Sequence, residues 1–287
     1  MTIPIAFLIC TEPGRLEGQS ILLAESIREF AGDMKNTPIY SFHPRIGSPI
    51  HIQTQQKFDE LRVIHQQIHL NIEFSDYYLA NKPLVCAHAE QTIDADILVF
   101  LDSDKCIFQE PKAFFLPDEY NVGLRPEYGR GIGSRGKGDR NENYWKTLYD
   151  LFNIKQEVFI TTPIGNQKIR GYWNSGMVVV RRNAGIFTAW RDNFLQVKRL
   201  GIEPAQGNYM LEQSLLSITV CTLNQTVYTL PLSYSYPLPL HNRVSQESKI
   251  TSFDNLVSIH YFNMFLFDNW NSQFNTLKNI NLRCEKL

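Results

Sequence analysis

The sequence predicts an α/β fold, a three-layer sandwich built on a mostly parallel central sheet. Over the first hundred residues, apolar segments follow the order β-α-β-α-β-α-β, which is typical of parallel sheets with right-handed crossovers. Residues 97–101 are all apolar, and so short a run suits a strand that is buried on both faces. This strand ends at two carboxylates, Asp102 and Asp104, at the sheet edge where ligands bind in such folds.

In chain order, the first strand covers residues 4–10, and Pro13 and Gly14 mark the turn that follows it. A helix follows over 21–30, because apolar residues recur there at helical spacing. The other elements of this half are strands at 37–42, 68–74 and 97–101 and helices at 58–64 and 77–90, where Pro83 could interrupt the last helix. In the second half the pattern loosens and predicts strands at 120–124, 176–181, 227–230 and 256–260 and helices at 144–152, 186–200 and 209–220.

Length and composition indicate a globular protein. The chain has 287 residues, of which 43% are hydrophobic and 20% are charged. We interpret it as a single domain over 1–287, with a nucleotide-binding half at about 1–104 and an acceptor-binding half at about 105–287. The net charge of −1 gives no general attraction for nucleic acid, so no nucleic-acid partner is expected.

The cellular compartment is expected to be reducing. The five cysteines are scattered and include no C-x-x-C pair, which argues against a disulfide framework and against a zinc site. Residues 2–10 lack the basic segment and the cleavage site of a signal peptide, and no apolar run approaches the ~18 residues of a membrane-spanning helix. We therefore predict a cytoplasmic protein without a transmembrane segment, and a peripheral contact with a membrane stays open.

Asp102, Asp104 and His260 are candidate metal ligands. Two carboxylates at the end of a buried strand make a poor core but a good site for Mg²⁺ or Mn²⁺ that carries a diphosphate. His260 ends the predicted strand at 256–260 and could supply a neutral imidazole nitrogen as a third ligand. The alternatives are an aspartate that only caps a turn and a histidine that is only hydrogen-bonded at a strand end.

Two further groups of residues are candidates for binding the substrate. Asn174, Ser175 and Gly176 form a small polar turn before an apolar strand, where side chains could reach sugar hydroxyls and Gly176 could permit close approach. Glu212 and Gln213 offer a carboxylate and an amide near the start of a predicted helix. For these residues the alternatives are an ordinary turn and a solvated helix face.

The segment 125–143 is glycine-rich and basic. It contains G-x-G-x-x-G and nearly matches the phosphate-binding pattern G-x-x-x-x-G-K-[ST], but Gly138 stands where the hydroxyl should be. Two interpretations stay open, a mobile loop that closes over a diphosphate or an anionic acceptor and a disordered solvent loop.

Four segments, 98–104, 173–180, 212–216 and 259–262, resemble in sequence and order the motifs of GT-A-fold (Rossmann-like) glycosyltransferases. The resemblance covers roughly residues 4–270 and is strongest to the retaining branch that contains glycogenin and galactinol synthase. It implies that Asp102, Asp104 and His260 bind Mn²⁺ and that Lys82, on the helix before the aspartates, helps to hold the nucleotide. The chain departs from the family at 263–270, where Gly and Lys-Pro-Trp are expected.

The resemblance implies metal-dependent transfer of a sugar, most simply from a UDP-sugar, to a saccharide or another hydroxyl acceptor. The donor site would then comprise Lys82, Asp102, Ser103, Asp104 and the turn Asn174, Ser175 and Gly176. Glu212 and Gln213 would be catalytic, with retention of configuration. Two alternatives remain, a sugar-nucleotidyltransferase and a non-catalytic protein that binds carbohydrate or nucleotide with the same fold.

Overall fold

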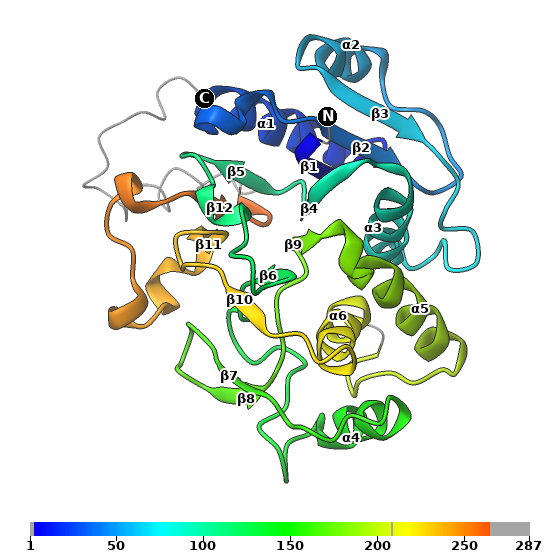
Figure 1. Cartoon of the computed structure of the whole chain (residues 1–287), viewed down its shortest axis with the longest axis vertical. Helices are drawn as coiled ribbons and strands as arrows, with labels where there is room; N and C mark the ends of the chain where they lie inside the picture. The colour runs from blue at the N-terminus through cyan, green and yellow to red at the C-terminus, as the bar shows by residue number, and fades with distance from the viewer. Residues whose placement is uncertain (1–2, 208, 265–287) are drawn as a thin grey trace.

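A seven-stranded sheet forms the centre of the computed structural model, which describes residues 3–207 and 209–264 (Figure 1). Its strand order is β10-β6-β9-β4-β1-β2-β3. The strands are β1 (Ile3–Cys10), β2 (Ile39–His43), β3 (Val63–Gln67), β4 (Ala95–Leu101), β6 (Val122–Leu124), β9 (Met177–Arg181) and β10 (Val227–Thr229). Strand β9 is antiparallel to its neighbours β4 and β6, and the other pairs in this sheet are parallel. The predicted mostly parallel sheet is therefore confirmed.

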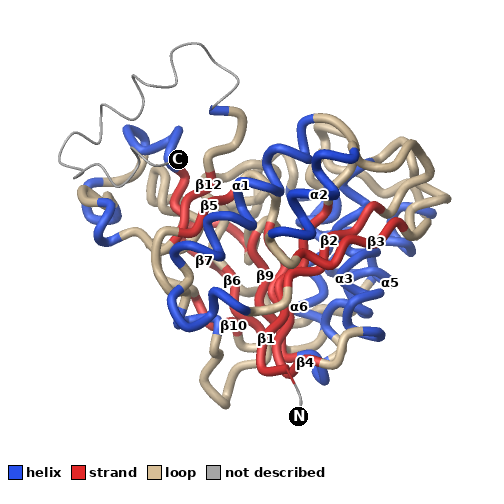
Figure 2. Tube along the Cα trace, turned by 90° about the horizontal axis from the view of Figure 1, so that it is seen from above, coloured by secondary structure: helices blue, strands red, loops and turns tan. Residues whose placement is uncertain are grey.

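Helices cover both faces of the sheet, as Figure 2 shows, and the pleat of the strands explains why. In β1, the alternate residues Ile5, Phe7 and Ile9 pack in the same core cluster as helix α1 (Arg15–Phe30), whereas Ala6 and Leu8 pack in the cluster of helix α3 (Asn81–Thr92). Helices α4 (Glu142–Leu151), α5 (Ile186–Arg199) and α6 (Leu211–Thr222) share the α3 cluster, and α2 (Ile52–Glu60) shares the α1 cluster. The three-layer arrangement is thus the predicted one.

Two smaller sheets complete the fold. Strand β5 (Lys105–Ile107) pairs antiparallel with β12 (Ser258–His260), which also pairs with β11 (Tyr236–Pro237), and β7 (Phe159–Thr161) pairs with β8 (Lys168–Arg170). Short 3₁₀ helices lie at η1 (Gly32–Asn36), η2 (Tyr78–Ala80), η3 (Lys112–Phe114), η4 (Arg182–Ala184), η5 (Leu238–Arg243), η6 (Gln246–Ser248) and η7 (Phe253–Asn255). The sequence did not predict the short strands β5, β7, β8 and β11.

Two predicted elements exist but were placed wrongly. The helix predicted at 58–64 is α2, which covers Ile52–Glu60. The strand predicted at 68–74 is β3, which covers Val63–Gln67. Strand β3 is at the edge of the sheet, so it buries Val63 but leaves most of its other side chains partly or fully exposed, and it carries no apolar run. An edge strand of this kind gives little signal in the sequence.

The other predicted elements are confirmed, with boundaries that shift by a few residues. Helix α1 begins earlier than predicted, at Arg15, and Pro83 does not interrupt α3 because it lies in the first turn, where the missing N–H has no intrahelical partner to lose. Among residues 3–207 and 209–264, no helix is long and apolar enough to cross a membrane. Most of the stretch 263–270, where the chain departs from the family pattern, lies outside the described residues.

Glu17 is expected to stabilise the start of α1. Its carboxylate accepts hydrogen bonds from the N–H groups of Gly14 and His51, both at 2.8 Å, and from the hydroxyl of Thr54. Burial raises the pKa of Glu17, but these hydrogen bonds outweigh burial and lower the pKa from 4.5 to about 2. The carboxylate therefore stabilises the fold fully above pH 4.5, and this contribution is lost as the pH falls toward 2.

We expect Glu17→Gln to lower the free energy of unfolding by about 1–2 kcal/mol at neutral pH. Urea unfolding of both proteins at several pH values measures this, and the difference should shrink between pH 4.5 and pH 2. A difference that stays constant over that range would contradict the assignment to an ionised carboxylate.

Candidate active site

The candidate site lies where β4 ends and β9 begins. These strands pair antiparallel with Leu101 opposite Met177, so the residues just outside the pair, Asp102 and Gly176, also face each other. The N–H of Asp102 donates to the carbonyl of Gly176 at 2.9 Å. Sheet register therefore brings the two aspartates and the polar turn 174–176 together, in agreement with the common donor site that the family resemblance implies.

The structure leaves no space for a side chain at Gly176. A Cβ atom at this position would lie 2.4 Å from Oδ2 of Asp102 and 3.1 Å from Oδ1 of Asn174. The absence of a side chain thus lets the Asp102 carboxylate sit against the turn.

We expect Gly176→Ala to weaken binding of the donor predicted from the sequence, a UDP-sugar with Mn²⁺, by about tenfold, because the methyl group must displace the Asp102 carboxylate. Isothermal titration calorimetry measures the effect. The matched control is Gly18→Ala on the exposed side of α1, where a Cβ atom meets nothing within 4 Å. Equal affinities for the two variants would contradict the role of Gly176.

Asp102, Asp104 and His260 come together, as predicted. Each offers one ligand atom, and these atoms all lie within 4.8 Å of one another. Both carboxylate oxygens of Asp104 lie 3.1 Å from Nε2 of His260, but Oδ1 is off the hydrogen-bond direction and has no hydrogen-bond partner among the described residues. A buried anionic oxygen without a partner fits a place for a cation.

Tyr128 orients the imidazole of His260. Its hydroxyl donates to the carbonyl of Ser235 at 2.8 Å and lies 3.0 Å from Nδ1 of His260. In the tautomer with its hydrogen on Nε2, the imidazole donates to Oδ2 of Asp104 at 3.1 Å, and in the tautomer with its hydrogen on Nδ1 it donates to Tyr128 and turns the lone pair of Nε2 toward Asp104. Burial lowers the pKa of His260, which favours a neutral imidazole. The second tautomer is the one suited to share a metal with the carboxylate.

The antiparallel pairing of β5 and β12 places His260 opposite Lys105. Lys105 directly follows Asp104 in the chain. Lys105 is fully buried and donates to Oγ of Ser235 at 2.8 Å. Burial lowers the pKa of Lys105 to about 8, against the opposing charges of Asp102 and Asp104. Its ammonium group, which the sequence analysis did not single out, therefore stays charged at neutral pH and balances part of the acidic charge.

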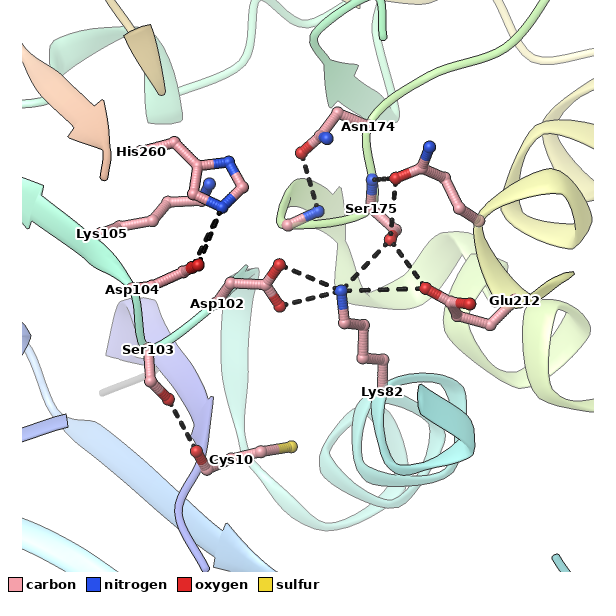
Figure 3. A network of polar contacts seen from close by, with 12 residues as sticks. Cys10, Lys82, Asp102, Ser103, Asp104, Lys105, Asn174, Ser175, Glu212 and His260 are labelled. Carbon is pink, nitrogen blue, oxygen red and sulfur yellow. Dashed lines mark hydrogen bonds and ion pairs between the residues drawn. The ribbon is translucent and has the colours of Figure 1, made fainter. Parts of the chain in front are cut away.

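Lys82 projects from the first turn of α3 into the site (Figure 3). Its Nζ lies 3.0 Å from both oxygens of Asp102, 3.4 Å from Oγ of Ser175 and 3.8 Å from Oε1 of Glu212. Burial lowers the pKa of Lys82, but Asp102 and Glu212 outweigh burial and hold the pKa above its ordinary value. The predicted lysine is therefore a charged group at the centre of the network.

Glu212 and Gln213 lie behind the turn 174–176. The N–H of Ser175 donates to Oε1 of Gln213 at 3.0 Å, and its hydroxyl donates to Oε1 of Glu212 at 3.2 Å. Tyr77 donates to the other oxygen of Glu212 at 2.7 Å, and burial raises the pKa of Glu212 although Lys82 opposes this. Glu212 and Gln213 are 0% and 2% exposed, so in this arrangement they support the turn from within.

Sequence reasoning missed Glu127. Its Oε2 accepts hydrogen bonds from the amides of Asn174 and Gln213, both at 2.9 Å, and its side chain is partly exposed. Its N–H donates to the carbonyl of Tyr172, and this pairing sets it beside the turn. No local pattern marks Glu127, because the contact joins segments far apart in the chain.

Ser103 is close to the site, but its hydroxyl points away from the two aspartates, as Figure 3 shows. It donates to the carbonyl of Cys10 at 2.7 Å and accepts from Ser20 at 3.2 Å. In this structure the side chain ties the aspartate turn to the end of β1.

The glycine-rich pattern at 131–138 contacts α4 and β8. The indole of Trp145 donates to the carbonyl of Ile132 at 2.8 Å, and the N–H of Arg170 donates to the carbonyl of Ser134 at 2.7 Å. These contacts anchor the middle of the loop, and none of them involves the two aspartates.

Comparisons with known proteins agree with this fold. A family model described as the Rhodobacterales glycosyltransferase domain matches residues 7–224, and no curated protein matches the chain. Similar solved structures include the apo form of the bifunctional glycosyltransferase WbbM (13% identity, TM-score 0.58, 99% of this chain and 51% of that chain). They also include the apo form of the glycosyltransferase GlyE from Streptococcus pneumoniae TIGR4 (11% identity, TM-score 0.52, 95% of this chain and 60% of that chain). The chain thus spans little more than half the length of these proteins, and at such identities the likeness shows the fold.

Proposed function

Since the chain belongs to the family of Rhodobacterales glycosyltransferase domains, we propose that it transfers a sugar from a nucleotide-diphosphate donor, with a UDP-sugar as the first candidate, to a hydroxyl acceptor. The fold alone does not fix this chemistry, so the proposal depends on the site. Its main support is the cluster of Asp102, Asp104 and His260, whose ligand atoms lie within 4.8 Å of one another at the end of β4.

The donor set fits a divalent cation. Carboxylate oxygens suit Mg²⁺ and Mn²⁺, and the imidazole nitrogen favours Mn²⁺. When bound, the cation supplies positive charge to the two phosphates of the leaving nucleoside diphosphate. Lys82 adds a second positive charge beside Asp102, and Oδ1 of Asp104, which has no hydrogen-bond partner among the described residues, supports a ligand role for that residue.

The sugar of the donor is proposed to lie against the turn 174–176. Asn174 and the partly exposed Glu127 offer an amide and a carboxylate there, which are the groups that bind sugar hydroxyls. The retaining outcome and the place in the glycogenin-like branch stay predictions. For retention, Glu127 joins Glu212 and Gln213 as a candidate to stabilise the positive charge that develops on the sugar.

A thermal-shift panel of UDP-, GDP- and other activated sugars, each with and without Mn²⁺, tests the proposal. A true donor should stabilise the protein by about 2.7 kcal/mol at a hundredfold excess over Kd, and only with the metal. Absence of any shift from nucleotide sugars with Mn²⁺ would contradict the proposal. Pyrophosphate release from a nucleoside triphosphate would instead identify a sugar-nucleotidyltransferase, and binding without turnover would favour a non-catalytic protein.

A further inference from the structure

Two exposed tyrosines flank the polar network of the site. Tyr78 begins η2, four residues before Lys82, and Tyr209 lies three residues before Glu212. Their exposed fractions are 60% and 56%, which makes them the most exposed tyrosines of the described residues. Because Nζ of Lys82 and Oε1 of Glu212 are 3.8 Å apart, the segments that carry the two tyrosines meet at this network.

Neighbouring contacts hold Tyr78 at this place, and the backbone next to Tyr209 is strained. Tyr77, next to Tyr78, donates to Glu212 at 2.7 Å and stacks on Phe194 of α5, which fixes the backbone of Tyr78. Met210, next to Tyr209, has a φ of +56°, and such strain in a residue other than glycine is often found at functional sites.

The electrostatic surroundings of Tyr209 agree with its place three residues before Glu212. Burial raises the pKa of Tyr209, and the acidic groups Glu127 and Glu212 add to this effect. Glu127 belongs to the site itself, because its carboxylate accepts from the amide of the turn residue Asn174 at 2.9 Å.

A tyrosine ring has an apolar face and a polar tip, and exposed rings of this kind are typical of binding surfaces. A pyranose ring has a matching build, with C–H groups on one face and hydroxyls around its rim. An aromatic ring can pack against the C–H face of a sugar while a neighbouring carboxylate or amide group hydrogen-bonds its hydroxyls.

We infer that Tyr78 and Tyr209, the tyrosine pair, form the platform on which the acceptor binds and that this acceptor is a saccharide. The inference rests on the proposed function, because it assigns the acceptor of that reaction. Stacking on the pair holds the sugar ring, and the partly exposed carboxylate of Glu127 beside the turn 174–176 offers an acceptor for its hydroxyls.

Ligand-detected saturation-transfer NMR tests the inference with methyl β-D-glucopyranoside, methyl β-D-galactopyranoside, lactose and maltose as probes and glycerol as the non-saccharide control, all with UDP and Mn²⁺ present. At least one saccharide, but not glycerol, should receive saturation from the wild-type protein. Tyr78→Ala and Tyr209→Ala should each weaken its binding by about tenfold. Tyr209→Phe keeps the ring, and Phe115→Ala removes an aromatic residue that is 51% exposed elsewhere, so both should stay within about twofold of wild type.

Absence of saccharide binding to the wild-type protein would overturn the inference, and so would alanine variants that bind as wild type does. Mn²⁺-dependent hydrolysis of UDP-glucose and UDP-galactose without acceptor, measured on the same proteins, separates the two proposals. The tyrosine variants should hydrolyse these donors at the wild-type rate. A tenfold loss of hydrolysis in the variants would place the pair in the donor site and overturn the inference. Absence of hydrolysis with any donor would count against the proposed function, while the NMR result would still decide the acceptor site.

Discussion

Replacement of Asp104 by asparagine should reduce Mn²⁺-dependent hydrolysis or transfer of a UDP-sugar by about a hundredfold or more. Asparagine keeps the shape of the side chain but removes the charge, so the cluster with Asp102 and His260 loses a strong ligand. The same loss is expected for Asp102→Asn, which also removes the counter-charge of Lys82. Steady-state kinetics at several Mn²⁺ concentrations should show that added metal restores part of the activity.

The matched control is Asp254→Asn, which neutralises an exposed carboxylate outside the site and should leave the rate unchanged. Mn²⁺-dependent activity that survives in both Asp102→Asn and Asp104→Asn would contradict the metal site. Both carboxylates are only partly buried, so both variants should fold. The unfolding temperature of each variant checks this.

Lys82→Met should have the largest effect on stability among the site residues, about 3–5 kcal/mol, together with loss of donor binding. The change leaves Glu212, which is 0% exposed, without the ammonium group at 3.8 Å that offsets its charge. Burial already raises the pKa of Glu212, and loss of Lys82 raises it further. Protonation then relieves the buried charge, so the stability deficit of the variant should shrink as the pH falls from 7 toward 5.

The double variant Lys82→Met/Glu212→Gln separates this electrostatic effect from simple loss of packing. Because glutamine carries no charge, the double variant should recover much of the lost stability and should show little pH dependence. Urea unfolding at pH 7 and pH 5 measures both quantities. A double variant that is less stable than Lys82→Met at both pH values would contradict the account.

Much of the fold could be predicted because its central strands are buried on both faces. Strands β1, β4 and β9 are apolar along most of their length, and the sequence shows this directly. Where burial is slight, as at the edge strand β3, the pattern is weak and the prediction failed. Element boundaries depend on caps and turns, which explains why α1 starts at Arg15 and not at Ile21.

The site was predictable where it follows from sheet register and not where it follows from long-range packing. Asp102 and the turn at 174–176 adjoin paired strands, so their meeting could be expected. Glu127 lies beside that turn because residues 125–127 pair with residues 172–174, and Glu212 is buried because α6 packs behind the turn. Residue type and spacing do not encode these contacts.

Direct Mn²⁺ binding tests the central claim most closely. Electron paramagnetic resonance can follow free Mn²⁺ during titration of the wild-type protein with UDP present, and the same titration applies to Asp104→Asn and His260→Gln. The account predicts that the wild-type protein binds Mn²⁺ and that each variant binds it at least about tenfold more weakly. Equal Mn²⁺ affinity in all three proteins, or no binding by the wild type, would contradict it.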